Sequence, residues 1–209
     1  MPYLTGSPWW MRKIYDDLVW QMPATGNKIY LSFDDGPHPE VTTYVLDLLK
    51  AYHASSSFFC IGNNVDAYPE IYQRILDEGH VTGNHSYDHL NGWKTDDKAY
   101  VENIKKASKI IHSNLFRPPY GRMKKSQIRE LKNQFPGMKI IMWSVLSGDF
   151  DTTIDGEKCF DIVRKKTSAG SIIVFHDSEK AFGRLKICLP KVLAYFSGKG
   201  YVFDTLTPP

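Results

Sequence analysis

The sequence has few cysteines and no long apolar run, and each absence excludes a class of protein. The three cysteines among its 209 residues, Cys60, Cys159 and Cys188, are widely separated and odd in number. Neither a disulfide framework nor a thiolate zinc site is therefore expected, and we expect Cys60 and Cys188 to be small core residues. No stretch approaches the roughly 18 apolar residues that a membrane span needs. The sequence favours a soluble globular protein.

Basic runs and targeting signals are also absent. The net charge is only +3, and without a basic run there is no reason to expect nucleic acid as a partner. Residues 1–21 lack the charged start, apolar run and cleavage site of a secretory leader. We expect residues 1–27 to form an N-terminal extension packed on the domain. Its tryptophans either pack against the domain or form a sticky surface, and we favour packing for Trp9, Trp10 and Trp20. Residues 28–209 are expected to form one domain.

Short apolar runs alternate with helical patterns along the chain, which is typical of βα units. Strands are predicted at residues 28–34, 56–61, 81–84, 115–117, 139–143, 172–175 and 201–203. Helices are predicted at residues 41–52, 70–78, 96–113, 124–133, 158–167 and 185–196. About seven such pairs fit a parallel barrel or an open doubly wound sheet. In either fold, functional residues collect at the carboxyl ends of the strands.

Polar residues that can bind a metal or transfer a proton follow five of these strands. The five segments are Asp34-Asp35-Gly36-Pro37, residues 84–89, residues 117–120, residues 148–151 and residues 175–177. A metal site, an acid and a base could be assembled from these five strand ends.

A metal site is predicted from two histidines and a carboxylate. His85 and His89 are four residues apart, so on a helical turn they lie on one face and can bind one ion. That spacing alone is weak support for a metal site. The Asp34-Asp35 pair at the end of another strand strengthens it. Two acids in one pocket repel each other unless a cation is present. Asp35 would complete a three-ligand site of the kind that zinc occupies in enzymes.

Three other strand-end residues each have a structural and a functional interpretation. Arg117 is either a surface charge or the partner of a buried carboxylate. Asp149, after Gly148, is either a turn residue or a charge partner. His176 is either a core histidine or, beside a carboxylate, a protonated donor.

Taken together and in this order, these segments resemble the polysaccharide deacetylases of the NodB-homology type, carbohydrate esterase family four. The matching motifs are Ser-Phe-Asp-Asp-Gly-Pro, His-Ser-x-x-His, Arg-Pro-Pro-Tyr and the strand that ends in His176. The resemblance covers residues 28–209. It implies a distorted (β/α) barrel of about seven strands, with a groove across its top.

The resemblance also implies a role for each matching residue. Asp35, His85 and His89 match the metal ligands, Asp34 the general base and His176 the general acid. Arg117 matches the residue that orients Asp34, Asp149 the partner of His176, and Tyr120 the residue whose backbone N–H binds the oxyanion. The residues that would line the pocket for the acetyl methyl group are Phe150, Val174 and Phe175.

Three positions depart from the commonest family pattern. Ser32 replaces a frequent threonine, with little expected consequence. Phe150 replaces a frequent tryptophan, and Leu146 stands where many members carry an acid. These departures bear on how the substrate fits rather than on the reaction. Trp93 either stacks on a sugar ring or packs over a helix start.

The expected activity is metal-dependent removal of N-acetyl groups from an N-acetylated glycan, such as a chitooligosaccharide or peptidoglycan. An O-acetyl esterase with the same site and a non-catalytic sugar-binding module are the alternatives. Zinc is the expected metal, with cobalt and nickel as alternatives. Such glycans usually lie outside the cytoplasm, so work at the cell envelope is expected although no leader is visible.

Overall fold

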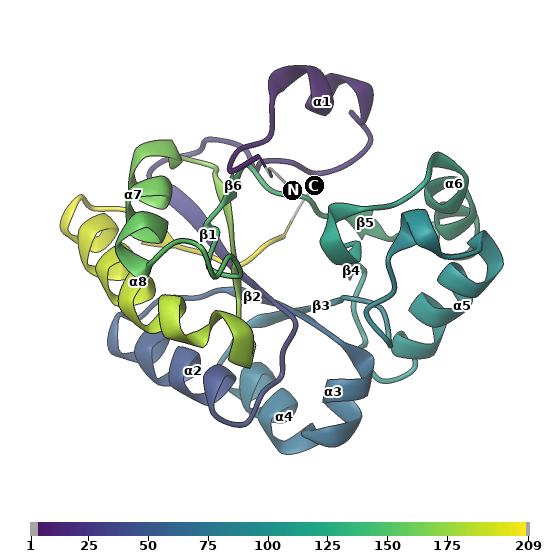
Figure 1. Ribbon diagram of the computed structural model, residues 1–209, viewed down its shortest axis with the longest axis horizontal. Helices are drawn as coiled ribbons and strands as arrows, with labels where there is room; N and C mark the ends of the chain where they lie inside the picture. The colour runs from purple at the N-terminus through teal and green to yellow at the C-terminus, as the bar shows by residue number, and fades with distance from the viewer. Residues whose placement is uncertain (1–3, 208–209) are drawn as a thin grey trace.

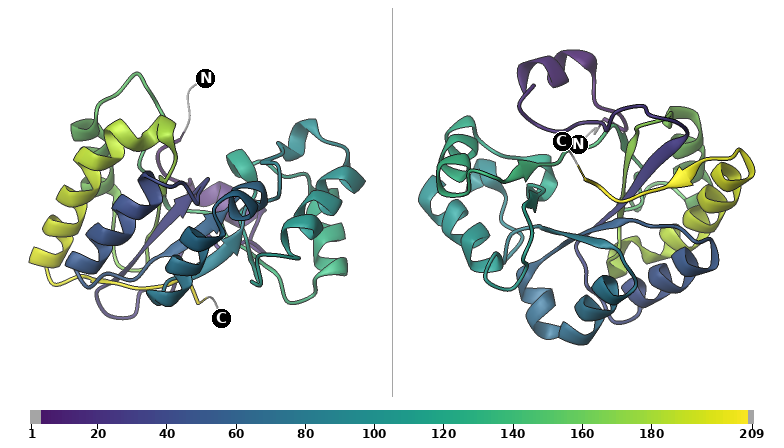
Figure 2. Two further views of the ribbon diagram at one scale, coloured as in Figure 1. Left: turned by 90° about the horizontal axis from the view of Figure 1, so that it is seen from below. Right: turned by 180° about the vertical axis from the view of Figure 1, so that it is seen from behind.

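The computed structural model describes residues 4–207, and within them seven parallel strands form a half-barrel. The strands are β1 (Lys28–Asp34), β2 (Ser57–Cys60), β3 (Val81–Asn84), β4 (Leu115–Phe116), β5 (Lys139–Ile140), β6 (Val145–Leu146) and β7 (Ile172–His176). Their order across the sheet is β5-β4-β3-β2-β1-β7-β6. An eighth strand, β8 (Val202–Phe203), pairs with the start of β1, as the view from behind in Figure 2 shows. The predicted barrel-like α/β fold is confirmed.

Helices surround the strands as a ring (Figure 1). They are α1 (Trp9–Ile14), α2 (Val41–Ala51), α3 (Gly62–Ala67), α4 (Pro69–Asp77), α5 (Asp97–Ala107), α6 (Lys125–Gln134), α7 (Gly156–Lys166) and α8 (Glu179–Gly198), with short 3-10 turns at Gly92–Lys94 and Pro119–Gly121. In Figure 1, α1 lies at the top, between α7 and α6. None of the helices within residues 4–207 is long and apolar enough to cross a membrane.

Strand β1 is central because its residues are apolar or small on both faces. Every residue of β1 except Lys28 is buried, as expected for a parallel strand covered on both sides. On the helix-covered face, the ring of Phe33 stacks at 5.1 Å from Phe58 and 5.9 Å from Phe175. This packing fixes the position of Asp34, the last residue of β1.

The core contains the three cysteines. Cys60, Cys159 and Cys188 are buried and free, and all three belong to the main apolar cluster. The expectation that Cys60 and Cys188 are core residues is confirmed. Burial raises the pKa of each thiol above its ordinary value, so all three remain neutral thiols at pH 7.

The N-terminal segment, residues 4–22, joins the two edges of the half-barrel. Gly6 pairs with Val145 in β6, while Val19 pairs with Ile141, just after β5. Trp20 is buried, as expected, but Trp9 and Trp10 are 75% and 48% exposed. The prediction that all three tryptophans pack into the domain is therefore wrong for Trp9 and Trp10.

Candidate active site

The carboxyl ends of the strands meet at one cleft, as the sequence predicts. The cleft has a volume of about 860 Å³. The titratable residues that line it at its base are Asp34, Asp35, His85, His89 and His176. These residues come from the ends of β1, β3 and β7 or from the loops that follow, so the parallel register of the strands brings them together.

Asp35, His85 and His89 form a cluster that can hold a metal ion. One ligand atom from each residue lies within 4.8 Å of the other two. Asp35 Oδ1 is 3.2 Å from His89 Nε2 and 3.7 Å from His85 Nε2. Neither contact has hydrogen-bond geometry, so this buried oxygen accepts no hydrogen bond from the described residues.

The state of His85 favours a cation over a proton at the cluster. Its Nδ1 is 2.8 Å from the carbonyl oxygen of Arg117. Nδ1 therefore carries the proton and donates it to the carbonyl, which leaves the Nε2 lone pair facing Asp35. Burial lowers the pKa of His85 to about 4, so the ring is neutral at pH 7. A neutral imidazole and an unpartnered carboxylate oxygen fit a divalent cation such as zinc.

The Asp35 carboxyl is ionised despite its position. Burial alone would raise its pKa, but the contact with His89 and the charge of His176 hold that pKa well below its ordinary value. An ionised carboxylate beside two imidazole rings is a donor set that suits zinc, cobalt or nickel.

Asp34 makes an ion pair with Arg117 beneath the cleft. Arg117 Nη1 is 2.5 Å from Asp34 Oδ1, and Arg117 is fully buried while Asp34 is 4% exposed. Asp34 lines the cleft, so the arginine holds the carboxylate from behind. Of the two interpretations of Arg117, the structure supports the partner of a buried carboxylate.

Arg117 is held by contacts on several sides. It donates to the carbonyl oxygens of Ile141 and Met142 at 3.3 Å, and its guanidinium lies 3.9 Å from the Phe59 ring centroid. Nη1 also donates to Ser32 Oγ at 2.9 Å. No motif pointed to this contact of Ser32, where serine in place of threonine was expected to have little consequence. Threonine carries the same hydroxyl, which is why either residue can serve there.

His176 is held by Asp149 on the other side of the cleft. The side chain of Asp149 is fully buried, and its Oδ1 is 2.8 Å from His176 Nδ1. Asp149 Oδ2 also accepts the backbone N–H of His176 at 2.8 Å. Burial lowers the pKa of His176, but Asp149, followed by Asp35 and Asp34, outweighs it and raises the pKa to about 9. His176 is therefore a protonated donor rather than a neutral core histidine.

Asp177 fixes the turn after Asp35. Its Oδ1 accepts the backbone N–H of Gly36 at 3.0 Å, and its Oδ2 accepts the hydroxyl of Thr42. A Cβ at position 36 would lie 2.0 Å from Asp177 Oδ2, so only glycine allows this approach. These contacts make Asp177 a brace for the turn rather than a group that faces the substrate.

Several residues of the site have a strained backbone. Asp35, Ser86, His89 and Tyr120 have φ values of +83°, +62°, +55° and +60°. Such conformations cost side-chain-bearing residues about 1–3 kcal/mol each and persist where the surroundings enforce them. Their concentration in three loops of the cleft is typical of a functional site.

The residues expected to contact substrate divide into two groups. Phe150, Val174 and Trp93 line the cleft, and the Phe150 ring is 5.2 Å from that of His176. Phe175 lies elsewhere: it belongs to the core cluster and stacks on Phe33. The alternation of side chains along β7 explains the difference, because neighbours on a strand point to opposite faces.

Tyr120 lies at the rim beside the histidine cluster. Its ring is 59% exposed and 4.6 Å from the His89 ring. Lys180 also lines the cleft. The His38 ring instead accepts N–H groups at the start of α2.

The sequence and the fold both match known proteins. The profile of the family described as polysaccharide deacetylase matches residues 21–136. A peptidoglycan-N-acetylglucosamine deacetylase of Bacillus cereus is 31% identical over 196 residues, 91% of each chain. A chitooligosaccharide deacetylase of Azorhizobium caulinodans is 33% identical over 158 residues, 72% of this chain and 74% of that one.

A solved structure confirms the likeness of the fold. The Bc1960 peptidoglycan N-acetylglucosamine deacetylase superposes with a TM-score of 0.86 at 29% identity, over 96% of this chain and 95% of the other. The profile match spans more than half of the sequence, and the Bacillus cereus relative aligns over nearly all of it. The chain belongs to the polysaccharide deacetylase family.

Proposed function

We propose that the chain is a metal-dependent hydrolase that removes N-acetyl groups from the amino sugars of a glycan, of the peptidoglycan or chitooligosaccharide type. The observation that supports this proposal most is that Asp34, the Asp35-His85-His89 cluster and His176 all line one cleft. A base, a cation-binding set and a protonated acid are the groups that amide hydrolysis needs. Glycans of this type place the activity at the cell envelope.

Asp35, His85 and His89 would hold the cation, with zinc first and cobalt or nickel as alternatives. When bound, a divalent cation polarises the acetyl carbonyl and lowers the pKa of water toward about 7 in favourable zinc sites. Asp177 contributes indirectly, because it holds the Asp35-Gly36 turn in place.

Asp34 accepts the proton of the attacking water. Its position at the end of β1 places the carboxylate in the cleft, and the ion pair with Arg117 fixes its orientation. As the water adds to the acetyl carbon, negative charge develops on the carbonyl oxygen. The backbone N–H of Tyr120 donates to that oxygen, and losing one such donor typically costs about 10²–10³ in rate.

His176 donates a proton to the departing amine. Its Nδ1 is occupied by Asp149, so Nε2 is the nitrogen available in the cleft. The C–N bond breaks as the nitrogen takes this proton, and acetate and the free amino sugar result. Phe150 and Val174 contact the acetyl methyl group, and Trp93 contacts a sugar ring.

The buried Asp149-His176 pair favours an N-acetyl over an O-acetyl substrate. An amine needs a proton in order to leave, whereas an alcohol leaves an ester with less help. Release of acetate from N-acetylated and O-acetylated glycans, before and after His176→Ala, tests the proposal. We expect release from the N-acetyl substrate and a larger loss there than on the ester. Turnover of O-acetyl glycans alone would instead establish the esterase.

Replacing Asp149 with asparagine is expected to move the alkaline limb of the pH–rate profile to lower pH. Because its pKa is raised, His176 stays protonated and able to act as the acid until the pH passes that pKa, and activity is lost above it. The variant loses the largest raising influence, so the acid form is lost at lower pH. Asp35 also raises the His176 pKa, and a bound cation would neutralise that carboxylate. The test therefore compares the alkaline limb of Asp149→Asn with that of the unmodified protein.

The matched control is Asp161→Asn, which removes a carboxylate that, among residues 4–207, pairs with Arg164 and Lys165 on α7. Its alkaline limb should coincide with that of the unmodified protein. An Asp149→Asn profile that also coincides with it would show that Asp149 does not set the protonation of His176.

A further inference from the structure

The N-terminal segment closes the open side of the half-barrel. The edge strands β5 and β6 lie at opposite ends of the sheet. Residues 141–144, which connect them, form no strand that would pair the two edges. Backbone hydrogen bonds from the segment reach both edges: Val19 N donates to Ile140 O at 2.9 Å, and Leu146 N donates to Thr5 O at 3.1 Å. Residues 4–22 therefore form part of the barrel wall.

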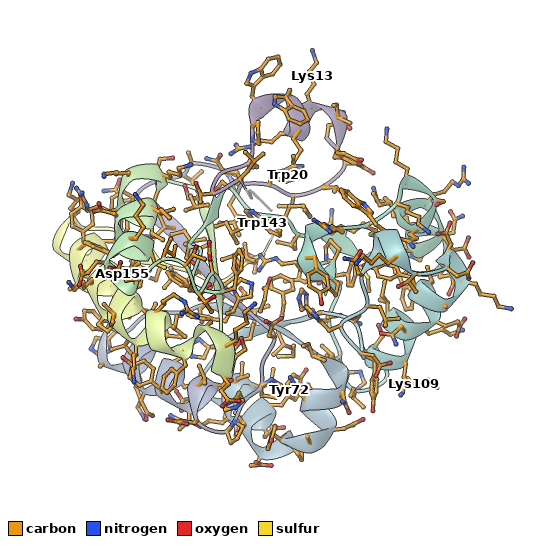
Figure 3. All side chains as sticks on the ribbon, in the orientation of Figure 1. Lys13, Trp20, Tyr72, Lys109, Trp143 and Asp155 are labelled. Atoms are coloured by element: carbon orange, nitrogen blue, oxygen red, sulfur yellow. The ribbon has the colours of Figure 1, made fainter. Side chains whose placement is uncertain are left out.

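Side-chain hydrogen bonds link the part of this segment before α1 to the part after it. Arg12 donates to Ser7 Oγ, before α1, at 3.1 Å and to Gln21 Oε1, after it, at 2.8 Å. Trp20 Nε1 donates to the carbonyl of Tyr15 at 2.9 Å. Figure 3 shows Trp20 and Trp143 between α1 and the centre of the strands in that view, while Lys13 points away from the body. The part of the segment that carries α1 is thus held in place by specific hydrogen bonds.

The same segment lines the active-site cleft. The cleft that contains Asp34 and His89 is also lined by residues of the N-terminal segment, among them Pro8, Trp10 and Met11. Its volume of about 860 Å³ lies in the upper part of the range of about 300–1,000 Å³ typical of small-molecule sites. The cleft therefore extends beyond the space that one acetamido group needs.

Trp9 and Trp10 are neighbours with different surroundings. Trp10 lines the cleft and is 48% exposed, whereas Trp9 is 75% exposed and is not among the lining residues. Trp93 and Tyr120 line the cleft from other loops. The guanidinium of Arg122 lies 4.9 Å from the Trp93 ring centroid. Exposed indole rings at the cleft provide flat apolar surface at low cost in conformational entropy.

We propose that the N-terminal segment forms a glycan-binding wall in which Trp10 stacks on a sugar ring remote from the one that is deacetylated. The inference rests on the proposed function for the identity of the ligand, and it makes an extended oligosaccharide the preferred substrate. The apolar C–H face of a pyranose ring matches an indole face. Continuity of the cleft from Trp10 to Asp34 and His89 links this contact to the reacting group.

The test compares Trp10→Ala with Trp9→Ala on N-acetylglucosamine oligomers of two lengths. For the hexasaccharide, Trp10→Ala should raise KM by about 5- to 30-fold and leave kcat unchanged. For the disaccharide, which under this proposal is too short to contact Trp10, the KM of Trp10→Ala should equal that of the unmodified protein. Trp9→Ala should change neither KM. Trp10→Phe keeps a flat ring and should recover much of the hexasaccharide affinity.

Two outcomes would overturn the inference. Equal KM values for Trp10→Ala and Trp9→Ala on the hexasaccharide would remove Trp10 from the binding site. An equal rise in KM on both oligomers would show that Trp10 acts on the reacting sugar or on folding. Calorimetric titration of hexasaccharide into Asp34→Asn protein, with and without Trp10→Ala, measures the same contact without turnover. A binding difference there would keep the glycan wall even if the unmodified protein released no acetate, which is the outcome that would refute the proposed reaction.

Discussion

Replacing Asp34 with asparagine is expected to lower kcat by about 10²–10⁴-fold, the usual contribution of a general base. Asparagine has the same size, and its side-chain oxygen can still accept the hydrogen bond from Arg117. It cannot take a proton from water. The substitution therefore removes the chemical function of the residue while keeping its shape. Acetate release under saturating substrate measures the effect.

Metal affinity separates this effect from damage to the site. Asp34 is outside the Asp35-His85-His89 cluster, so the dissociation constant for zinc should change little in Asp34→Asn. Asp35→Asn is the matched control, because it should weaken zinc binding strongly. Activity of Asp34→Asn within tenfold of the unmodified protein would refute its role as base.

Replacing Arg117 with methionine is expected to destabilise the fold by about 3–5 kcal/mol, as is typical when one partner of a buried ion pair is removed. Asp34 would remain buried without its counter-charge, and the carbonyls of Ile141 and Met142 would lose a donor. For a chain of this length, that loss corresponds to a fall in Tm of roughly 6–20 °C. Thermal unfolding followed by circular dichroism measures it.

A double-mutant cycle identifies the cause of this loss. In Asp34→Asn/Arg117→Met no unpaired charge remains, so the double variant should lose less stability than the sum of the two single variants. Coupling between contacting residues is typically about 0.5–3 kcal/mol. Strict additivity would show that the arginine stabilises the fold through packing on Phe59 and its carbonyl contacts alone.

Much of the fold could be predicted from the sequence because its strands are apolar runs that end at turn-forming residues. β1 and β3 have the predicted bounds. The helix predicted at residues 96–113 ends at Ala107. Ile110 and Ile111 continue the apolar spacing, and Ile111 is fully buried although it lies outside the helix. Apolar spacing reports burial, and burial continues past the end of a helix.

The region between β5 and β6 could not be predicted locally. One strand was expected at residues 139–143, but β5 ends at Ile140 and β6 begins at Val145. The chain leaves one edge of the sheet there and joins the other. Each edge is paired with the N-terminal segment, more than a hundred residues away in sequence. These pairings depend on tertiary closure, which no local pattern encodes.

The base of the site was predictable and its rim was not. The carboxyl ends of parallel strands lie at one edge of the sheet whatever the conformation of the loops that follow. The residues that meet there as expected are Asp34, Asp35, His85, His89 and His176. The position of Phe175 depends on which face of β7 each side chain occupies, and that of Trp10 on how residues 4–22 cross the barrel. Neither is visible in a short motif.

We propose above all that this cleft removes N-acetyl groups with a bound divalent metal. The most direct test measures acetate release from an N-acetylglucosamine oligosaccharide or peptidoglycan by protein stripped with a chelator, before and after zinc, cobalt or nickel is added. We expect no release from the stripped protein, recovery with at least one metal, and no recovery in His89→Ala. Equal release with and without metal would contradict the proposal, as would no release from any N-acetyl substrate with every metal.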